Sequence, residues 1–416
     1  MTELVNPTRT AAFEARLRTR YAAEKRFKAL GLGAILVSVA VLLFLLTTMV
    51  ANGLGGFQRA EVSVPIDFTQ SGLSLDPSVT DRNEAVRRLE SQGLPDTLRF
   101  FAGEALGDAS ADELSSDAWR EVANAVLDDP AMLQRSETFS LPAGSGLSAG
   151  LAGEGSAEDR ALAAQLLRDG KLREVFDPGF LTRSDATDPQ AVGIWGALKG
   201  SMLTMLVTLL LAFPIGVLAA LYLEEYAPKN RWTDIIEVSI NNLAAVPSII
   251  FGLLGLAVFL WIFPNMRSAP LIGGMTLALM TMPVIVIAGR NAIKAVPPSI
   301  RDGALAIGAS PIQVVFHHVL PLALPGILTG TIIGMARALG ETAPLLMIGM
   351  RAFVATPPDG FTSPATVLPV QIFLWSDEID RGFVERTSAA IIVLLLFLLV
   401  MNGLAIYLRN KFEKTW

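Results

Sequence analysis

Two ionisable residues, Arg337 and Glu341, stand four positions apart in an otherwise apolar stretch, and Thr342 follows them directly. Four residues are about one helical turn, so the guanidinium and the carboxylate would share a helix face near the middle of a membrane span. Charged groups inside a membrane are costly and commonly face a cavity or a pathway. An arginine there would suit an oxyanion, whose binding the carboxylate would tune. We therefore expect Arg337, Glu341 and Thr342 to line a substrate pathway, with a purely structural ion pair as the alternative.

Other patterns that carry chemistry are missing from the sequence. The two histidines, His317 and His318, are adjacent and lack the surrounding acidic residues of a zinc site, so we expect them to be structural. No phosphate loop, nucleophile elbow or glycine-rich dinucleotide turn occurs. The sequence thus predicts a chain that is not an enzyme and has no metal or cofactor of its own. Energy for transport would come from another chain or from an ion gradient.

The composition is that of a membrane protein, with 52% hydrophobic and 17% charged residues in 416 and a mean hydropathy of +0.49. A helix needs about 20 apolar residues to cross a bilayer. Six stretches meet or approach this length: 30–50, 200–223, 237–262, 271–289, 322–349 and 387–408. We predict an all-α membrane protein with six transmembrane helices.

Within the fifth stretch, Gly326, Gly330 and Gly334 recur every four residues. Residues at this spacing lie on one side of a helix, and small residues there let a second helix approach closely. We expect these glycines to form a helix-packing stripe.

The distribution of basic residues predicts the orientation in the membrane. Lysine and arginine gather in the tail 1–29, in the loops 224–236 and 290–301, and at the C-terminal end. These parts, and with them both termini, would be cytoplasmic in a bacterial inner membrane. We favour a retained first span at 30–50 over a cleaved signal peptide, because the basic tail is long and no clear cleavage site follows.

Residues 51–192 carry 24 Asp and Glu against 12 Lys and Arg, a net charge of −12 in a chain whose total is −6. We expect a small, mainly helical extracytoplasmic domain without disulfides, since the chain has no cysteine. The patterns predict helices at 81–92, 112–128 and 157–170, a short strand at Glu61–Asp67 and a flexible connector at 141–156. An acidic docking rim and a solvated insertion both remain possible roles.

The loop 297–321, between the fourth and fifth spans, opens with a first predicted helix. Two prolines precede Ser299, which is expected to be its N-cap, and Asp302 follows three positions later as in a capping box. Gly308 is expected to end this helix.

A second predicted helix follows at once in the same loop. Ser310 is expected to cap it, Pro311 suits its first position, and Gln313 can reach back to the cap. Pro321 is expected to end it. Its apolar residues form one stripe, which would lie either on the membrane domain of this chain or against another chain.

This loop resembles the EAA loop of the inner-membrane subunits of binding-protein-dependent ABC importers. That pattern runs Glu-Ala-Ala, three residues, Gly, nine residues, Ile, one residue, Leu-Pro. The matching positions here are Asp302, Gly303, Ala304, Gly308, His318, Leu320 and Pro321. Asp302, Gly303 and His318 depart from the pattern. The resemblance implies a coupling helix that seats on an ATPase subunit, with Ser299, Ser310 and Pro311 as further residues of the coupling loop.

Three more strings resemble phosphate-specific ABC permeases of the PstA type: LEEYAP at 223–228, NLAAVPSIIFGL at 242–253 and RALGETAPLL at 337–346. The likeness covers about 192–416. It implies a type I ABC-importer permease core at 193–416, with transmembrane helices 2 to 6 and the coupling loop 297–321. Such a permease imports inorganic phosphate by alternating access.

The family also implies partners. These are a sister permease of the PstC type, two ATPase subunits of the PstB type that carry ATP and Mg, and an extracytoplasmic phosphate-binding protein. The lipid bilayer surrounds the spans, and nothing points to nucleic acid.

Alternatives remain at this stage. A sulfate or molybdate permease would share the coupling loop, and a membrane arginine does not distinguish these oxyanions. An ion-coupled secondary transporter would usually show two matched halves, which we do not find. A membrane-anchored sensor would need a cytoplasmic signalling domain, and no predicted cytoplasmic stretch is long enough.

Overall fold

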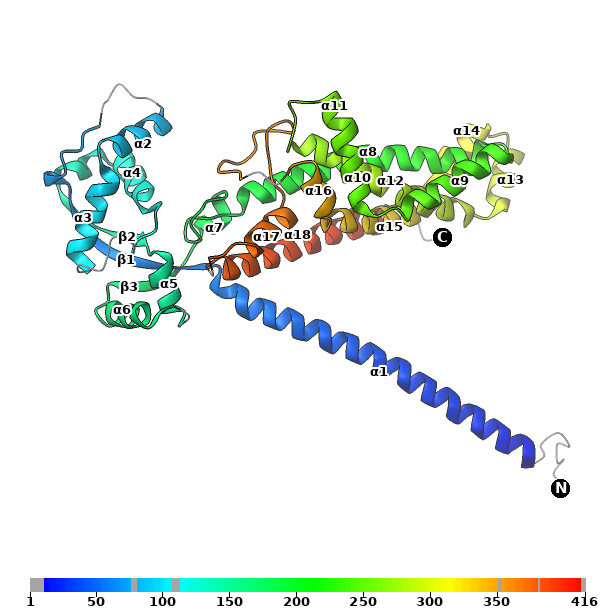
Figure 1. Cartoon of the computed structure of the whole chain (residues 1–416). Coiled ribbons are helices and arrows are strands. Elements are labelled where there is room, and N and C mark those ends of the chain that lie inside the picture. The colour runs from blue at the N-terminus through cyan, green and yellow to red at the C-terminus, as the bar shows by residue number, and fades with distance from the viewer. Residues whose placement is uncertain are drawn as a thin grey trace. The chain divides into compact units, whose positions relative to one another are not determined.

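A computed structural model describes residues 11–75, 81–106, 113–153, 155–350, 353–380 and 382–412 (Figure 1). The chain divides into two compact units, Met1–Asn52 and Gly53–Trp416. Within the described residues, five helices are long and apolar enough to cross a membrane, or six if one bent pair counts as a single span. This agrees with the predicted all-α membrane fold.

The first unit consists of most of helix α1, Ala11–Gly55. Large apolar side chains along it, among them Phe27, Ile35 and Phe44, are exposed. In a protein surrounded by water such a surface would be costly, whereas a lipid environment accommodates it without penalty. This exposure fits the predicted first span at 30–50.

The second unit begins with a small domain built on three antiparallel strands. These are β1 (Gln58–Asp67), β2 (Ser136–Pro142) and β3 (Leu172–Phe176), in the order β2-β1-β3. Val62, Val64 and Ile66 alternate along β1 and point into a core that includes Trp119 and Leu147. The predicted strand at Glu61–Asp67 is therefore confirmed, and its two neighbours are additional.

Helices surround this sheet. They are α2 (Arg82–Ser91), α3 (Leu94–Leu106), α4 (Ala118–Asp128), α5 (Ser145–Leu151) and α6 (Ala157–Arg168). The three predicted helices correspond to α2, α4 and α6, but the second begins later than expected, because 113–117 are described and not helical; residue 112 lies outside the described residues. Helix α3 was not predicted.

The prediction of a flexible connector at 141–156 is wrong. Strand β2 ends at Pro142, and α5 occupies Ser145–Leu151 within the predicted connector. A Cβ at Gly150 would lie 2.5 Å from the backbone oxygen of Asp159, so this glycine allows α5 and α6 to pack closely. The glycines that suggested a linker instead serve close packing.

A buried arginine joins the base of this domain to the last long helix, α18 (Gly382–Phe412). Arg386 is 2% exposed and donates to the backbone oxygens of Gly56 at 2.7 Å and Pro189 at 2.9 Å. Its guanidinium also lies 3.3 Å from Asp177. These acceptors satisfy the guanidinium, so its charge is tolerated in a buried site. The same hydrogen bonds hold the chain segments at Gly56 and Pro189, which lead into and out of the domain, against α18.

The helical part of the second unit has helix α12 at its centre (Figure 1). Its helices are α7 (Gly179–Thr182), α8 (Trp195–Leu221), α9 (Arg231–Ala244), α10 (Ser248–Leu254), α11 (Leu260–Ile262), α12 (Pro270–Lys294), α13 (Pro298–Ala306), α14 (Pro311–Gln313), α15 (Leu320–Leu339), α16 (Ala343–Met347), α17 (Leu368–Ser376) and α18. The apolar window of α12 is 61% buried, against 11% for α18. Helix α18 therefore leaves most of its apolar surface for lipid or another subunit.

Helix α15 packs on α12 along its glycines. A Cβ at Gly326 would lie 2.7 Å from the Cβ of Ala292, and one at Gly334 would lie 2.9 Å from the methyl group of Thr281. Gly330 faces Ala288. Any larger residue would push the two helices apart.

The third predicted span, 237–262, is wrong as a single helix. Helix α9 ends at Ala244, and the chain bends by 104° before α10. Pro247 stands in the bend and takes the N-cap position of α10. It has no N–H to donate, and it disfavours helical backbone at Val246 before it, so the helix breaks there.

The fifth predicted span, 322–349, also differs. Helix α15 stops at Leu339, Gly340 caps it, and α16 starts at Ala343. The span is thus interrupted next to Arg337 and Glu341.

Candidate functional site

Helix α13 opens the predicted coupling loop, but Ser299 is not its N-cap. Pro297 holds the cap position and Pro298 the first helical position. Proline suits that position because its fixed φ is already helical and its missing N–H is not needed there. Ser299 and Asp302 are exposed residues within the helix, and the predicted capping box between them is wrong.

The turn between α13 and α14 is as the sequence indicates. Helix α13 ends at Ala306, and Gly308 adopts φ +92°, a left-handed conformation that favours glycine. Ser310 and Gln313 then form a reciprocal capping box. The Gln313 N–H donates to the Ser310 hydroxyl at 3.4 Å, and the Ser310 N–H donates to Gln313 Oε1 at 2.9 Å.

The prediction that Pro321 ends the second helix is wrong. From Pro311 the chain stays helical through a wide π turn, Val314–Val319, and continues into α15 as one candidate span, Pro311–Leu339. The wide turn accommodates a proline, whose ring and missing N–H would disturb a regular α-helix. The coupling loop is therefore continuous with the span that carries Arg337.

An apolar surface remains uncovered on this loop. Leu305, Ile307, Ile312 and Phe316 are exposed, Ile307 by 83%. Val314, Val315 and Val319 face the core instead. One side of the loop thus packs on its own chain while the other presents apolar side chains. Such a surface is typical of a contact with another protein.

Arg337 and Glu341 form an ion pair at the end of α15. Arg337 Nε lies 3.4 Å from Glu341 Oε1, and the two side chains are 50% and 20% exposed. Arg337 belongs to the last turn of α15, Glu341 follows the helix, and Thr342 stands at the N-cap of α16 without a side-chain cap bond. The pair therefore lies at a helix break rather than on a continuous helix face, and its arginine is open to an approaching anion.

The helices that follow the breaks at Pro247 and Gly340 pack against each other. Helix α10, after the bend at Pro247, packs against α16, after Thr342. A Cβ at Gly252 would lie 2.6 Å from the Cα of Pro344, so only a glycine allows this approach. The strings 242–253 and 337–346, far apart in the sequence, are brought together here.

Sequence reasoning missed a second group of charges, at the ends of α8 and α12. Arg290 forms ion pairs with Glu224 and Glu237, and Arg301 of α13 pairs with Glu225 at 2.8 Å. Glu224, Glu225, Glu237 and Arg290 lie at or next to the end of a predicted span, whereas Arg301 lies within the coupling loop. Charged residues at the ends of neighbouring spans were the sequence signal that could have pointed to these ion pairs.

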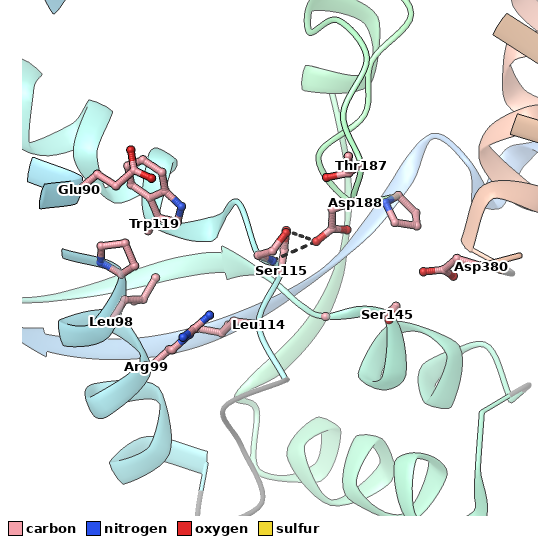
Figure 2. Close-up of a pocket in the computed structure, with 14 residues that line it drawn as sticks. Glu90, Leu98, Arg99, Leu114, Ser115, Trp119, Ser145, Thr187, Asp188 and Asp380 are labelled. Atoms are coloured by element: carbon pink, nitrogen blue, oxygen red, sulfur yellow. Dashed lines mark hydrogen bonds between the residues drawn. The ribbon is translucent and has the colours of Figure 1, made fainter. Parts of the chain in front are cut away.

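A pocket lies at the base of the small domain (Figure 2). It encloses about 530 Å³ and is lined by residues such as Trp119, Arg99 and Asp188. The Ser115 hydroxyl donates to Asp188 at 2.5 Å and the Ser116 N–H donates at 3.1 Å, so this carboxylate already has its partners. The pocket lies along a structural contact.

Comparison with known proteins supports the same core. Residues 212–414 match the family described as binding-protein-dependent transport system inner membrane component. The phosphate transport system permease protein PstA of Yersinia pestis is 31% identical over 223 residues, which are 53% of this chain and 74% of that protein. The chain belongs to the PstA-type permeases of binding-protein-dependent ABC importers.

Further comparisons match other parts of the chain or cover it to a different extent. The probable ABC transporter permease protein YqgI of Bacillus subtilis is 30% identical over 253 residues, or 56% of this chain and 84% of that protein. Among solved structures, a chain of the MetNI methionine ABC transporter is similar at 18% identity and a TM-score of 0.44, over 53% of this chain and 98% of that chain. Residues 14–160 match a domain of unknown function, DUF3333.

The chain belongs to this permease family and has several helices long and apolar enough to cross a membrane. It is therefore a multi-pass inner-membrane permease subunit, and it is not itself an ATPase. The predicted domain boundaries and the roles of the site residues stay predictions.

Proposed function

We propose that this PstA-type permease conducts inorganic phosphate into the cytoplasm by alternating access. The observation that carries the proposal is the meeting of α10 and α16 beside Arg337, since both helices belong to strings that resemble phosphate permeases. Similar curated proteins are described as phosphate transport system permeases, which supports the same substrate.

Arg337 is the residue we assign to the anion. Its guanidinium is half exposed and pairs with Glu341 through one contact at 3.4 Å, which leaves other N–H donors for phosphate oxygens. Glu341 limits how tightly the arginine holds the anion, and Thr342 offers a hydroxyl close by. Weak binding suits a pathway, because the anion must also leave.

ATP hydrolysis belongs to a partner in this proposal. Two ATPase subunits of the PstB type, which bind ATP and Mg, would contact the exposed apolar side of α13 and α14. A sister permease of the PstC type would complete the pathway, and a phosphate-binding protein would deliver the anion from outside. The basic segments support a cytoplasmic position of α13 and both termini in this proposal.

Uptake of labelled phosphate tests the substrate. The chain, reconstituted with its transport partners in vesicles, should take up phosphate in an ATP-dependent manner. A hundredfold excess of sulfate or molybdate should leave that uptake nearly unchanged. Uptake of sulfate or molybdate in preference to phosphate would reassign the substrate, and uptake driven by an ion gradient without ATP would contradict the proposed importer.

A further inference from the structure

Two consecutive glutamates at the end of α8 hold two different parts of the permease. They lie in a π turn, Tyr222–Tyr226, and consecutive helical residues point about 100° apart. Glu224 therefore faces α12, where it pairs with Arg290 and lies 3.3 Å from Lys294 Nζ. Glu225 faces α13 and pairs with Arg301.

Arg301 ties α13 to two helix ends at once. Besides Glu225 at 2.8 Å, its guanidinium donates to the backbone oxygens of Val296 at 2.7 Å and Ile293 at 3.0 Å. These carbonyls belong to the last turn of α12 and to the segment after it; the Ile293 oxygen also accepts the Val296 N–H at 3.2 Å, so Arg301 adds a further donor there. A single side chain of the coupling loop thus binds the ends of α8 and α12.

Apolar packing holds α13 on one side only, where Ala304 and the partly buried Ile300 lie against the core. Across Pro298–Ala306, all of which the structure describes, Ala304 alone is buried. Leu305 is 49% exposed, whereas the side chains of Arg301 and Glu225 are 23% and 12% exposed. Because the ion pair is sheltered, it is less weakened by water than a surface pair.

Arg290 extends the connection to α9. It lies between Glu224 and Glu237 of α9, and its side chain is 11% exposed. The structure describes every residue of α9, and none of them is fully buried; Ile240 packs partly against the core, and this ion pair adds a polar tie between α9 and α12. Helix α9 leads through the bend at Pro247 to α10, which contacts α16 at Gly252.

We propose that Arg301, Glu225, Glu224, Arg290 and Glu237 make α13, α9 and the ends of α8 and α12 one rigid unit. Movement of the coupling loop then reaches α9 directly, and through the bend it reaches the contact beside Arg337. These five residues position the moving parts and do not bind substrate. The inference rests on the proposed function and adds the residues that carry its coupling.

The first test measures phosphate imported per ATP hydrolysed by the complete reconstituted complex. Arg301→Gln and Glu225→Gln should each lower this ratio by about fivefold or more while ATP hydrolysis continues. The charge swap Arg301→Glu with Glu225→Arg should recover much of it. Arg231→Gln removes an exposed positive charge from the first residue of α9 and should leave the ratio unchanged.

A second test measures geometry and does not depend on activity. The chain has no cysteine of its own. Ser299→Cys in α13 and Trp232→Cys in α9 therefore give this chain two defined sites for spin labels. In the otherwise unchanged complex their separation should stay the same with and without ATP. In Glu225→Gln it should change or broaden when ATP binds.

Two results would overturn the inference. One is a transport ratio in Arg301→Gln and Glu225→Gln equal to that of the unchanged complex. The other is a label separation that already changes with ATP in the unchanged complex. Neither result affects the proposed function, which fails instead if the unchanged complex imports no phosphate.

Discussion

Gly252 is the residue at which the two breaks of the permease core touch. We expect Gly252→Val to force α10 away from α16, because the first added carbon already lies 2.6 Å from Pro344. Overpacking of this kind costs about 1–3 kcal/mol, and phosphate uptake should fall with it. Thermal unfolding in detergent and uptake in vesicles measure the two effects.

Gly403→Val is the matched control for this substitution. A Cβ at Gly403, within α18, meets no atom within 4 Å, so neither stability nor uptake should decrease. Unfolding and uptake of Gly252→Val that equal those of the unchanged chain would show that the contact is not needed.

Asp185 gives the protein a pH-dependent stability. Burial raises the pKa of this carboxyl above its usual value, although the indole N–H of Trp375 donates to it at 3.1 Å and acts in the opposite direction. The folded state therefore binds this proton more tightly than the unfolded chain, whose aspartates titrate near pH 3.9. Its stabilising contribution is complete below that value and is lost as the pH rises through the folded pKa.

Asp185→Asn keeps the acceptor oxygen but cannot ionise. We expect the variant to gain melting temperature relative to the unchanged chain as the pH rises from 4 through the folded pKa, and the difference then to level off. Melting curves across this range measure the effect. A difference that moves the other way would mean that the ionised carboxylate is favoured in the folded state.

At the scale of elements, the turn after α13 depends on Gly308. Its φ of +92° is strained for any residue with a side chain, so Gly308→Ala should cost about 1–2 kcal/mol locally. Hydrogen exchange of α13 and α14 should become faster, and ATP-driven uptake should decrease.

Gly303 provides the comparison within the same loop. It lies inside α13 with open space around its Cα, so Gly303→Ala should keep or strengthen the helix, by up to about 1 kcal/mol. Equal exchange rates in the two variants would contradict the role of the left-handed turn.

The elements that could be predicted are those with strong local signals. The apolar spans and the cap at Ser310 follow from residue types alone, because lipid burial and backbone satisfaction act over short stretches. Apolar length alone did not predict the breaks near Pro247 and Gly340, and the local signals for them are the proline itself and the charged residues on either side of Gly340. The prediction that Pro321 ends a helix was wrong because the π turn before it, Val314–Val319, keeps the chain helical.

The candidate site was predictable in its residues but not in its arrangement. Arg337 and Glu341 stand out as charges in an apolar stretch, and they do form a pair. Their position at a helix end, and the approach of Gly252, depend on contacts between distant segments. The charges around Arg290 were missed because each looked like an ordinary residue of a span end.

At the scale of the whole molecule, the small domain has a hydrophobic core of its own. That core includes residues from Ala60 to Leu172, whereas Phe180, Trp375 and Phe383 belong to a separate cluster at the base. Arg59 and Val175 are partners in the β1–β3 register, so removing 60–174 leaves two ends that a short turn can join. We expect this deletion to leave the permease core folded and its basal phosphate uptake intact.

Size-exclusion chromatography of the complex and uptake in vesicles would measure the result of this deletion. Loss of uptake by a shortened chain that still assembles would instead assign the domain a direct part in transport, such as docking of the binding protein.

The most direct test of the phosphate pathway is ATP-dependent uptake of labelled phosphate by the reconstituted complex carrying Arg337→Ala. We expect uptake to be lost, because the anion no longer meets its positive partner, while assembly and ATP binding continue as in the unchanged complex. Phosphate uptake at the rate of the unchanged complex would contradict the assignment of Arg337 to the pathway.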